Sequence, residues 1–203
     1  MGNFDRKNYI VEIWSTVDMT DPKVKDFSKN WAFTRNEQNE FFFGGNIFYH
    51  PFAERIIRFM IDYKGGVLIP DKWDGAEPLK QSFEPNNITE IVSALAKGGL
   101  ELFFRKKRQF WVRVSNCAHM WRASFICEGR NKPWILQKPH PAPIKYYTKI
   151  QFAFSEQMHP DFDFLKQLME DFCEYLETDY GLVYYEENHE IIHSYKGTVL
   201  IHE

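Results

Sequence analysis

One amphipathic segment near the C-terminus, Pro160 to Gly181, constrains the fold more than any other part of the chain. Its large apolar residues recur at steps of three and four, which is the spacing of one face of an α-helix. They are Phe162, Leu165, Leu168, Met169, Phe172 and Leu176. Pro160 suits the first helical position, and Gly181 suits a C-terminal cap. The segment therefore predicts a helix near residues 161–179 that buries these six side chains.

The opposite face of this predicted helix carries a stripe of negative charge. The stripe contains Asp163, Gln167, Glu170, Glu174 and Glu177, with Lys166 beside it. Like charges at this spacing repel by about 0.2–0.5 kcal/mol per pair, and Glu177 and Asp179 lie at the negative end of the helix dipole. Helix stability alone does not favour such a stripe. It is typical either of a solvated helix face or of a surface that binds a basic partner.

Charge is also polarised along the whole chain. Residues 156–203 contain 12 Asp and Glu against 2 Lys and Arg, a formal charge of −10. Because the complete chain carries −3, residues 1–155 carry +7. An acidic surface of this kind steers association with a basic protein.

Length and composition indicate a single globular domain spanning residues 1–203. A chain of 203 residues can bury one sizeable core. Its 44% hydrophobic and 26% charged residues are typical of a soluble protein, and no apolar run is long enough for a membrane span or a signal peptide. The 3 cysteines lack C-x-x-C spacing, which indicates reduced thiols in a cytoplasmic protein.

The remaining pattern predicts an α+β fold with about four helices on a mainly antiparallel sheet. Apolar residues at helical spacing, bounded by capping residues, Pro or Gly, predict helices near 21–33, 51–63 and 87–97 as well as 161–179. Runs of β-branched and aromatic residues predict the strands. These strands are 8–17, 67–69, 100–104, 109–115, 120–128, 144–155, 182–186, 191–195 and 198–202, with a hairpin at 41–48.

A proline-rich stretch, residues 131–143, divides the chain into two candidate sub-lobes, 1–130 and 144–203. One order of elements, strand, helix, strand, strand, recurs in Val67 to Ser115 and in Lys149 to Tyr195. This recurrence is compatible with two similar lobes around a shared or paired sheet.

One stretch matches a catalytic motif. His189-Glu190-Ile191-Ile192-His193 has the H-E-x-x-H pattern of zinc metalloproteases, in which two histidines on successive helical turns bind zinc. The flanking pattern is that of a strand, where residues four apart lie about 13 Å from each other, too far for two ligands of one zinc. We therefore expect no metal or other cofactor. A zinc hydrolase that uses His189 and His193 is the alternative hypothesis.

A basic turn, Arg105-Lys106-Lys107-Arg108, lies between Phe103-Phe104 and Phe110-Trp111. Basic residues among aromatic ones occur on nucleic-acid-binding surfaces, but also in charged turns that keep a sheet edge from pairing. The acidic balance of the whole chain favours the charged turn, so nucleic-acid binding is a second alternative.

These features lead to the hypothesis of a cytoplasmic immunity or inhibitor protein that neutralises a basic toxin, such as a nuclease. The long polar loop 71–85 adds Trp73 as a candidate contact, because long loops are often functional. We predict a protein partner rather than a membrane or a nucleic acid. The candidate partner-binding residues are Asp163, Glu170, Glu174, Glu177, Asp179, Glu186, Glu187 and Trp73.

Overall fold

The computed structural model describes residues 7–19, 49–75, 78–86, 88–95, 101–107, 109–116, 148–178, 180–188 and 190–195. Within these ranges, eight strands form one sheet in the order β3-β2-β4-β5-β6-β1-β7-β8, and every neighbouring pair is antiparallel. The strands are β1 (Asn8–Ser15), β2 (Lys72–Asp74), β3 (Gln81–Ser82), β4 (Glu101–Lys106), β5 (Phe110–Asn116), β6 (Thr148–Ser155), β7 (Tyr180–Tyr185) and β8 (Ile191–Ser194).

Three α-helices accompany the sheet in the described part of the chain. They are α2 (Pro51–Asp62), α3 (Thr89–Leu95) and α4 (Phe162–Leu176), with short 3₁₀ helices at η1 (Tyr63–Gly65) and η3 (Glu156–Met158). The predicted α+β class with a mainly antiparallel sheet is confirmed, but three helices are described rather than about four. The predicted helix 21–33, the segments 41–48, 120–128 and 198–202, and the linker 131–143 lie outside the described residues. None of the described helices combines the length and apolar character that a membrane span requires.

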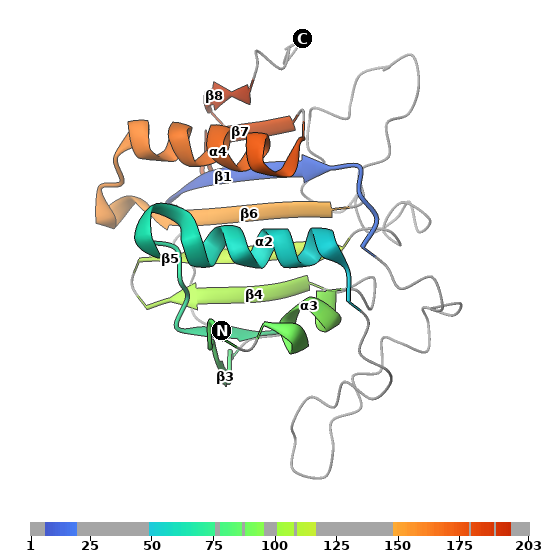
Figure 1. Ribbon diagram of the computed structural model, residues 1–203. Coiled ribbons are helices and arrows are strands. Elements are labelled where there is room, and N and C mark those ends of the chain that lie inside the picture. Colours follow the sequence, from blue (N-terminus) through green and yellow to red (C-terminus); the bar gives the residue numbers. More distant parts are fainter. Residues whose placement is uncertain are drawn as a thin grey trace, which may run out of the picture.

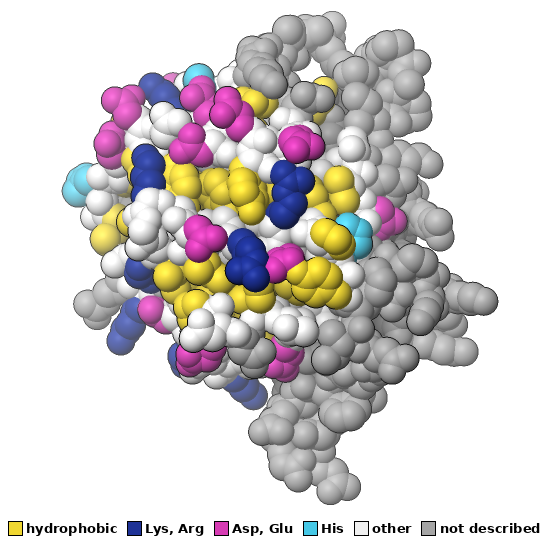
Figure 2. All heavy atoms as spheres, viewed as in Figure 1, with side chains coloured by type: hydrophobic (Ala, Val, Ile, Leu, Met, Phe, Trp, Pro, Cys, Tyr) yellow, Lys and Arg dark blue, Asp and Glu magenta, His cyan; other side chains and the backbone are white. Residues whose placement is uncertain are grey.

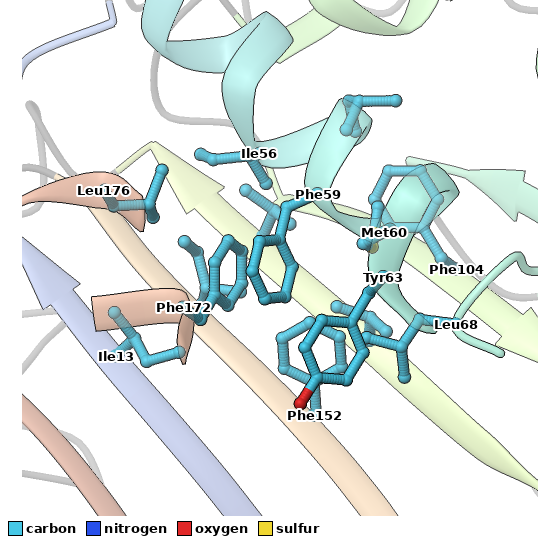
Figure 3. Packing of buried hydrophobic residues seen from close by; sticks show 14 of the residues in the cluster. Ile13, Ile56, Phe59, Met60, Tyr63, Leu68, Phe104, Phe152, Phe172 and Leu176 are labelled. Atoms are coloured by element: carbon cyan, nitrogen blue, oxygen red, sulfur yellow. The ribbon is translucent and has the colours of Figure 1, made fainter. Parts of the chain in front are cut away.

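The helices cover one face of the sheet, with α2 and α4 side by side across it (Figure 1). The core lies between these helices and the strands. Phe172 of α4 stacks on Phe59 of α2, with ring centroids 4.0 Å apart, and meets Phe152 of β6 edge-on at 5.6 Å. Figure 3 shows the three rings meeting between the two helices and the central strands. This aromatic contact joins both helices to the sheet.

Helix α4 buries the predicted apolar face, with one exception. Leu165, Leu168, Met169, Phe172 and Leu176 are buried, whereas Phe162 in the first turn is 44% exposed. The ends of the helix also differ from the prediction. Asp161 caps the N-terminus by accepting a hydrogen bond from the Asp163 amide at 3.0 Å, and Glu177, with a φ of 56°, forms the C-terminal cap.

Gly181 belongs to β7 and is not the cap of α4. A β-carbon built on it would lie 2.5 Å from both the Cys173 sulfur and the Met169 sulfur, so α4 approaches the strand too closely for any side chain. We expect Gly181→Ala to destabilise the fold by about 1–3 kcal/mol, as overpacking of a core does. Urea unfolding of the variant measures this cost. A Cys173→Ala background removes one clashing sulfur, so the same substitution should cost less there; equal costs in both backgrounds would contradict the close approach.

Helix α2 begins where its proline predicts. Pro51 occupies the first turn, and the His50 ring accepts a hydrogen bond from the Phe52 amide through Nδ1 at 3.2 Å. Burial lowers the pKa of His50, although Asp18 opposes this effect. The neutral imidazole is the form that can accept this capping hydrogen bond.

The segment after α2 differs from the prediction. Residues 67–69 form a turn region rather than a strand, and the predicted loop 71–85 contains β2 and β3. Trp73 lies in β2, pairs with Phe104 of β4 and is only 3% exposed. Its indole belongs to the hydrophobic core. This burial does not fit the predicted role of Trp73 as a contact residue, because the indole offers almost no surface to a partner.

The sheet interleaves the two candidate sub-lobes. Strand β1 pairs with β6 on one side and with β7 on the other. The order strand, helix, strand, strand is present at residues 149–195 as β6, α4, β7 and β8, and in the first segment as β3, α3, β4 and β5, which β2 precedes. In the sheet β1 lies between β6 and β7, and β2 lies between β3 and β4, so in both segments one further strand separates the first strand from the following two.

Candidate functional site

The outer face of α4 is a surface of exposed carboxylates. Figure 2 shows acidic side chains gathered over α4 and beside β8. The side chains of Asp163 and Glu177 are 91% and 83% exposed, and Glu174 is exposed as well. This orientation follows from the amphipathic pattern, because burial of Leu168 and Phe172 turns the opposite side of the helix to solvent.

Cations lie beside this acidic face at its ends and along one side. Lys166 lies 3.6 Å from Asp163, and Arg55 of α2 lies 3.7 Å from Glu177. Arg55 also donates to the Tyr175 carbonyl and lies 5.2 Å from the centre of its ring. Exposed ion pairs of this kind contribute only about 0–1 kcal/mol each, so these carboxylates remain available to a partner.

Glu170 differs from the other carboxylates because it contacts β8. Its Oε1 lies 2.8 Å from Nε2 of His193, which joins the middle of α4 to the edge strand of the sheet. Both side chains are only partly exposed. Glu170 therefore contributes to the negative surface while it also positions β8.

Asp171, on the flank of α4, faces α2 rather than a partner. It accepts hydrogen bonds from the Tyr63 hydroxyl at 2.9 Å and from the Gln167 amide at 2.6 Å. Burial of Tyr63, together with its hydrogen bond to Asp171, raises the pKa of the phenol well above its usual value. The hydroxyl therefore remains a donor, and Gln167 of the predicted stripe is engaged within α4.

The turn between β7 and β8 carries two further predicted contacts. Glu186 accepts a hydrogen bond from the side-chain amide of Asn8 at 2.7 Å, so its carboxylate is held at the start of β1. Glu187 is exposed, and its carboxylate accepts a hydrogen bond from the Tyr185 hydroxyl at 3.3 Å. The same hydroxyl also donates to the Glu156 carboxylate at 3.2 Å. Partial burial and these two carboxylates raise the pKa of Tyr185 to about 12.

Aromatic rings join this turn to the start of α4. The ring of Tyr9 lies 5.0 Å from that of Phe162 and 5.1 Å from that of Tyr185. The structure thus places Asp163, Glu170, Glu174 and Glu177 on one helix, and the turn with Glu187 near its N-terminal end. Asp179 lies outside the described residues.

The second histidine of the H-E-x-x-H stretch lies in a strand, as its sequence context predicts. His193 is part of β8, where it pairs with Val183 and contacts Glu170. His189 lies outside the described residues. Among the residues that the structure describes, no three His, Cys, Asp or Glu side chains gather as metal ligands would.

The basic turn is attached to the segment that precedes β2. The Asp71 amide donates to the Arg105 carbonyl at 2.9 Å, and the Asp71 carboxylate accepts from the Lys107 amide at 2.9 Å. The Lys106 ammonium lies 3.4 Å from the Val67 carbonyl. Arg108 lies outside the described residues.

Sequence reasoning missed a buried polar cluster on the face of the sheet that α2 and α4 do not cover. Its centre is Glu12 of β1, which is 3% exposed. The carboxylate accepts hydrogen bonds from Trp14 at 2.6 Å, Gln151 at 2.5 Å and Tyr184 at 3.1 Å, and pairs with Lys149 at 3.2 Å. The available signal was a charged residue inside the apolar run NYIVEIWS, because a buried charge requires partners.

This cluster is internally satisfied and therefore has the character of a structural element. Four donors from three strands converge on both oxygens of one carboxylate, and the Lys149 ammonium lies 4.9 Å from the centre of the Trp14 ring. Burial and the Glu12 charge raise the pKa of Tyr184 far above its usual value, which keeps its hydroxyl a donor.

Comparison of the chain with protein-family models, curated proteins and solved structures found no match.

Proposed function

We propose that this chain is an inhibitor of the immunity-protein type, which neutralises a basic protein such as a toxin nuclease by binding it through the acidic face of α4. The observation that carries the proposal is the exposure of Asp163, Glu174 and Glu177 on a helix whose opposite side is packed in the core. Zinc hydrolysis has less support, because His193 lies in a strand and contacts Glu170.

Packing makes α4 suitable as a binding platform. The helix is capped by Asp161 and anchored to α2 and β6 by Phe172, so its outer side chains project from a fixed backbone. A preorganised surface loses little conformational entropy on binding. A helix of 15 residues extends over about 22 Å, which spans several phosphate-binding positions of a nuclease cleft.

Attraction between opposite charges is the expected way in which the chain recognises its partner. Residues 156–203 carry a formal charge of −10 from 12 acidic and 2 basic residues, and this segment includes α4. Complementary surfaces of opposite charge raise association rates by about 10–1000-fold at low ionic strength. Carboxylates placed in a basic cleft would occupy the positions of substrate phosphates, and in this way inhibit a nuclease.

Reversing two charges on α4 tests the proposal. A partner is first captured with the immobilised chain and identified, and its association kinetics are then measured at several salt concentrations. We expect Glu174→Lys with Glu177→Lys to slow association at least about tenfold and to weaken its salt dependence, since exposed charges act mainly through steering. The free energy of unfolding should scarcely change, because both cations lie at the C-terminal end of α4, where the dipole favours them.

A matched variant controls for net charge. Glu84→Lys with Glu90→Lys changes the net charge by the same four units at two exposed positions outside α4. This control should inhibit and bind the captured protein nearly as the parent does. Equally slow association of both variants would show that the effect comes from net charge alone. Unaltered binding by the α4 variant would show that α4 is not the binding surface. A captured protein that is acidic, or that keeps its activity in the complex, would contradict the proposal.

A further inference from the structure

Three aromatic side chains form a patch where α4 begins. Phe162 opens the helix and is 44% exposed, although it belongs to the apolar side of the helix. Its ring meets that of Tyr9 edge-on, with centroids 5.0 Å apart. Tyr9 near the start of β1 pairs with Tyr185 at the end of β7, and their ring centroids lie 5.1 Å apart. An exposed aromatic surface therefore lies at the N-terminal end of the acidic helix.

Two carboxylates border this patch. Glu156 of η3 and Glu187, which follows β7, both lie beside the Tyr185 hydroxyl, at 3.2 and 3.3 Å. A phenol has one hydrogen, so it donates to only one of them at a time. Lys7 contacts Glu156 through its backbone carbonyl, which accepts from the Glu156 amide at 2.9 Å, and its side chain is exposed. Within the described part of the chain, neither carboxylate has an ion-pair partner.

The other end of α4 shows what a combination of ring and carboxylate binds. There the Arg55 guanidinium of α2 lies over the Tyr175 ring, 5.2 Å from its centre, and 3.7 Å from the Glu177 carboxylate. Arg55 also donates to the Tyr175 carbonyl. The fold thus already contains one arginine held by an exposed ring and a neighbouring carboxylate. The patch at the N-terminal end offers the same kinds of group to a cation from outside the chain.

The arrangement favours a guanidinium over an ammonium. A guanidinium is planar and weakly hydrated, so it can lie flat on an aromatic ring while its N–H donors reach carboxylate oxygens. An ammonium is a compact, strongly hydrated charge and lacks this fork of donors. The dipole of α4 is positive at this end, but the Asp161 carboxylate caps the helix there and offsets it.

We propose that this patch binds an arginine side chain of the basic partner, with the guanidinium against the exposed rings and paired with Glu156 and Glu187. The proposal rests on the proposed function, which supplies a basic protein as the source of the arginine. It adds a contact of a different kind. The exposed carboxylates of α4 steer association over a distance, whereas an arginine that is both stacked and paired is a short-range contact that slows dissociation.

A single arginine tests the patch without any partner. N-acetyl-arginine amide is titrated into the full chain, and the assigned ring signals of Tyr9, Phe162 and Tyr185 are followed by NMR. These signals should shift saturably with a Kd of about 10 mM or tighter, as expected for one cation that is stacked and paired. N-acetyl-lysine amide should bind at least about threefold more weakly, because it lacks the planar fork.

Two variants separate the carboxylates from the ring. Glu156→Gln with Glu187→Gln keeps the shape of both side chains and should weaken binding of the arginine derivative at least about fivefold, as loss of charge-assisted hydrogen bonds does. Phe162→Leu keeps an apolar side chain without the ring and should weaken it about threefold. Glu84→Gln with Glu90→Gln changes the net charge by the same two units elsewhere on the surface, so this control should bind as the parent does. Thermal unfolding of each variant checks that the fold is retained.

The captured basic partner tests the contact within the complex. The Glu156→Gln, Glu187→Gln variant should dissociate at least about tenfold faster than the parent, because loss of a short-range charged contact acts on the dissociation rate. Its association rate should stay within about twofold of that of the Glu84→Gln, Glu90→Gln control, since both variants lose the same charge.

Any of four results would overturn the arginine site. They are the absence of saturable ring shifts up to about 50 mM arginine derivative, equal affinity for the lysine derivative, equal weakening by the two glutamine pairs, and unchanged dissociation of the captured partner.

Failure of this site is distinguishable from failure of the proposed function. Unchanged dissociation of the glutamine variant, together with slower association of the Glu174→Lys, Glu177→Lys variant, would remove the arginine site and support the proposed function. Saturable binding of the arginine derivative without capture of any basic protein would retain the site and contradict the proposed function.

Discussion

Replacing Phe172 by alanine should lower the free energy of unfolding by about 3–5 kcal/mol, the usual cost of deleting a packed aromatic ring. Phe172 is fully buried, stacks on Phe59 at 4.0 Å and meets Phe152 at 5.6 Å. The substitution would open a cavity where α2, α4 and the sheet meet. Because domains are stable by only about 5–15 kcal/mol, such a loss is a large fraction of the total. Urea unfolding followed by circular dichroism measures it.

Phe162 provides a control of the same residue type on the same helix. It is 44% exposed and touches the Tyr9 ring at its edge, so Phe162→Ala should cost about 1 kcal/mol or less. Similar costs for the two substitutions would contradict the observed packing of α4. A cost below about 1 kcal/mol for Phe172→Ala would mean that the apolar face of the helix is accessible to solvent.

Removing the Glu12 carboxylate should also be strongly destabilising. Glu12→Ala leaves the Lys149 ammonium without its ion-pair partner and deprives three further donors of their acceptor. Loss of one member of a buried pair costs about 3–5 kcal/mol, because the remaining charge is uncompensated. Chemical denaturation at constant pH is the appropriate measurement.

A double-mutant cycle separates the ion pair from the hydrogen bonds. Replacing both charges, with Glu12→Gln and Lys149→Met, should cost clearly less than the sum of the two single substitutions, because neither charge is then left alone. Additive costs would show that Glu12 and Lys149 do not interact. Lys166→Met, which removes a cation from an exposed pair with Asp163, should change stability by less than about 1 kcal/mol.

The local sequence pattern was sufficient to predict the helices and strands whose apolar residues recur with a strong periodicity. Helix α2 begins at Pro51, and α4 buries five of its six predicted apolar residues. Residues 191–194 form a strand, as the context around His193 indicates. In each case the spacing of apolar side chains along the segment determines which face is buried, and this spacing is visible without knowledge of the neighbours.

Local sequence signals were less reliable for locating a helix end and a functional loop. The sequence pattern predicts a helix cap at Gly181, but this residue is a contact point between β7 and α4, where sulfur atoms of helix side chains occupy the space of a side chain. The polar composition around Trp73 predicts a loop, but a short strand there pairs with β4 and buries the indole. Both errors have the same origin, since a close approach between distant segments leaves no periodic signal.

The sequence by itself determined the α+β class, the amphipathic character of α4 and the charge of its outer face, because these properties depend on residues near one another in the chain. Only the tertiary structure decided that β1 lies between β6 and β7, that Glu12 collects donors from three strands, and that Arg105, Trp111 and Ala153 border one pocket. Strand order and cross-strand neighbours depend on pairings between segments more than 100 residues apart, for example Asn8 with Ser155. Such pairings are selected by the packing of the complete sheet against its helices.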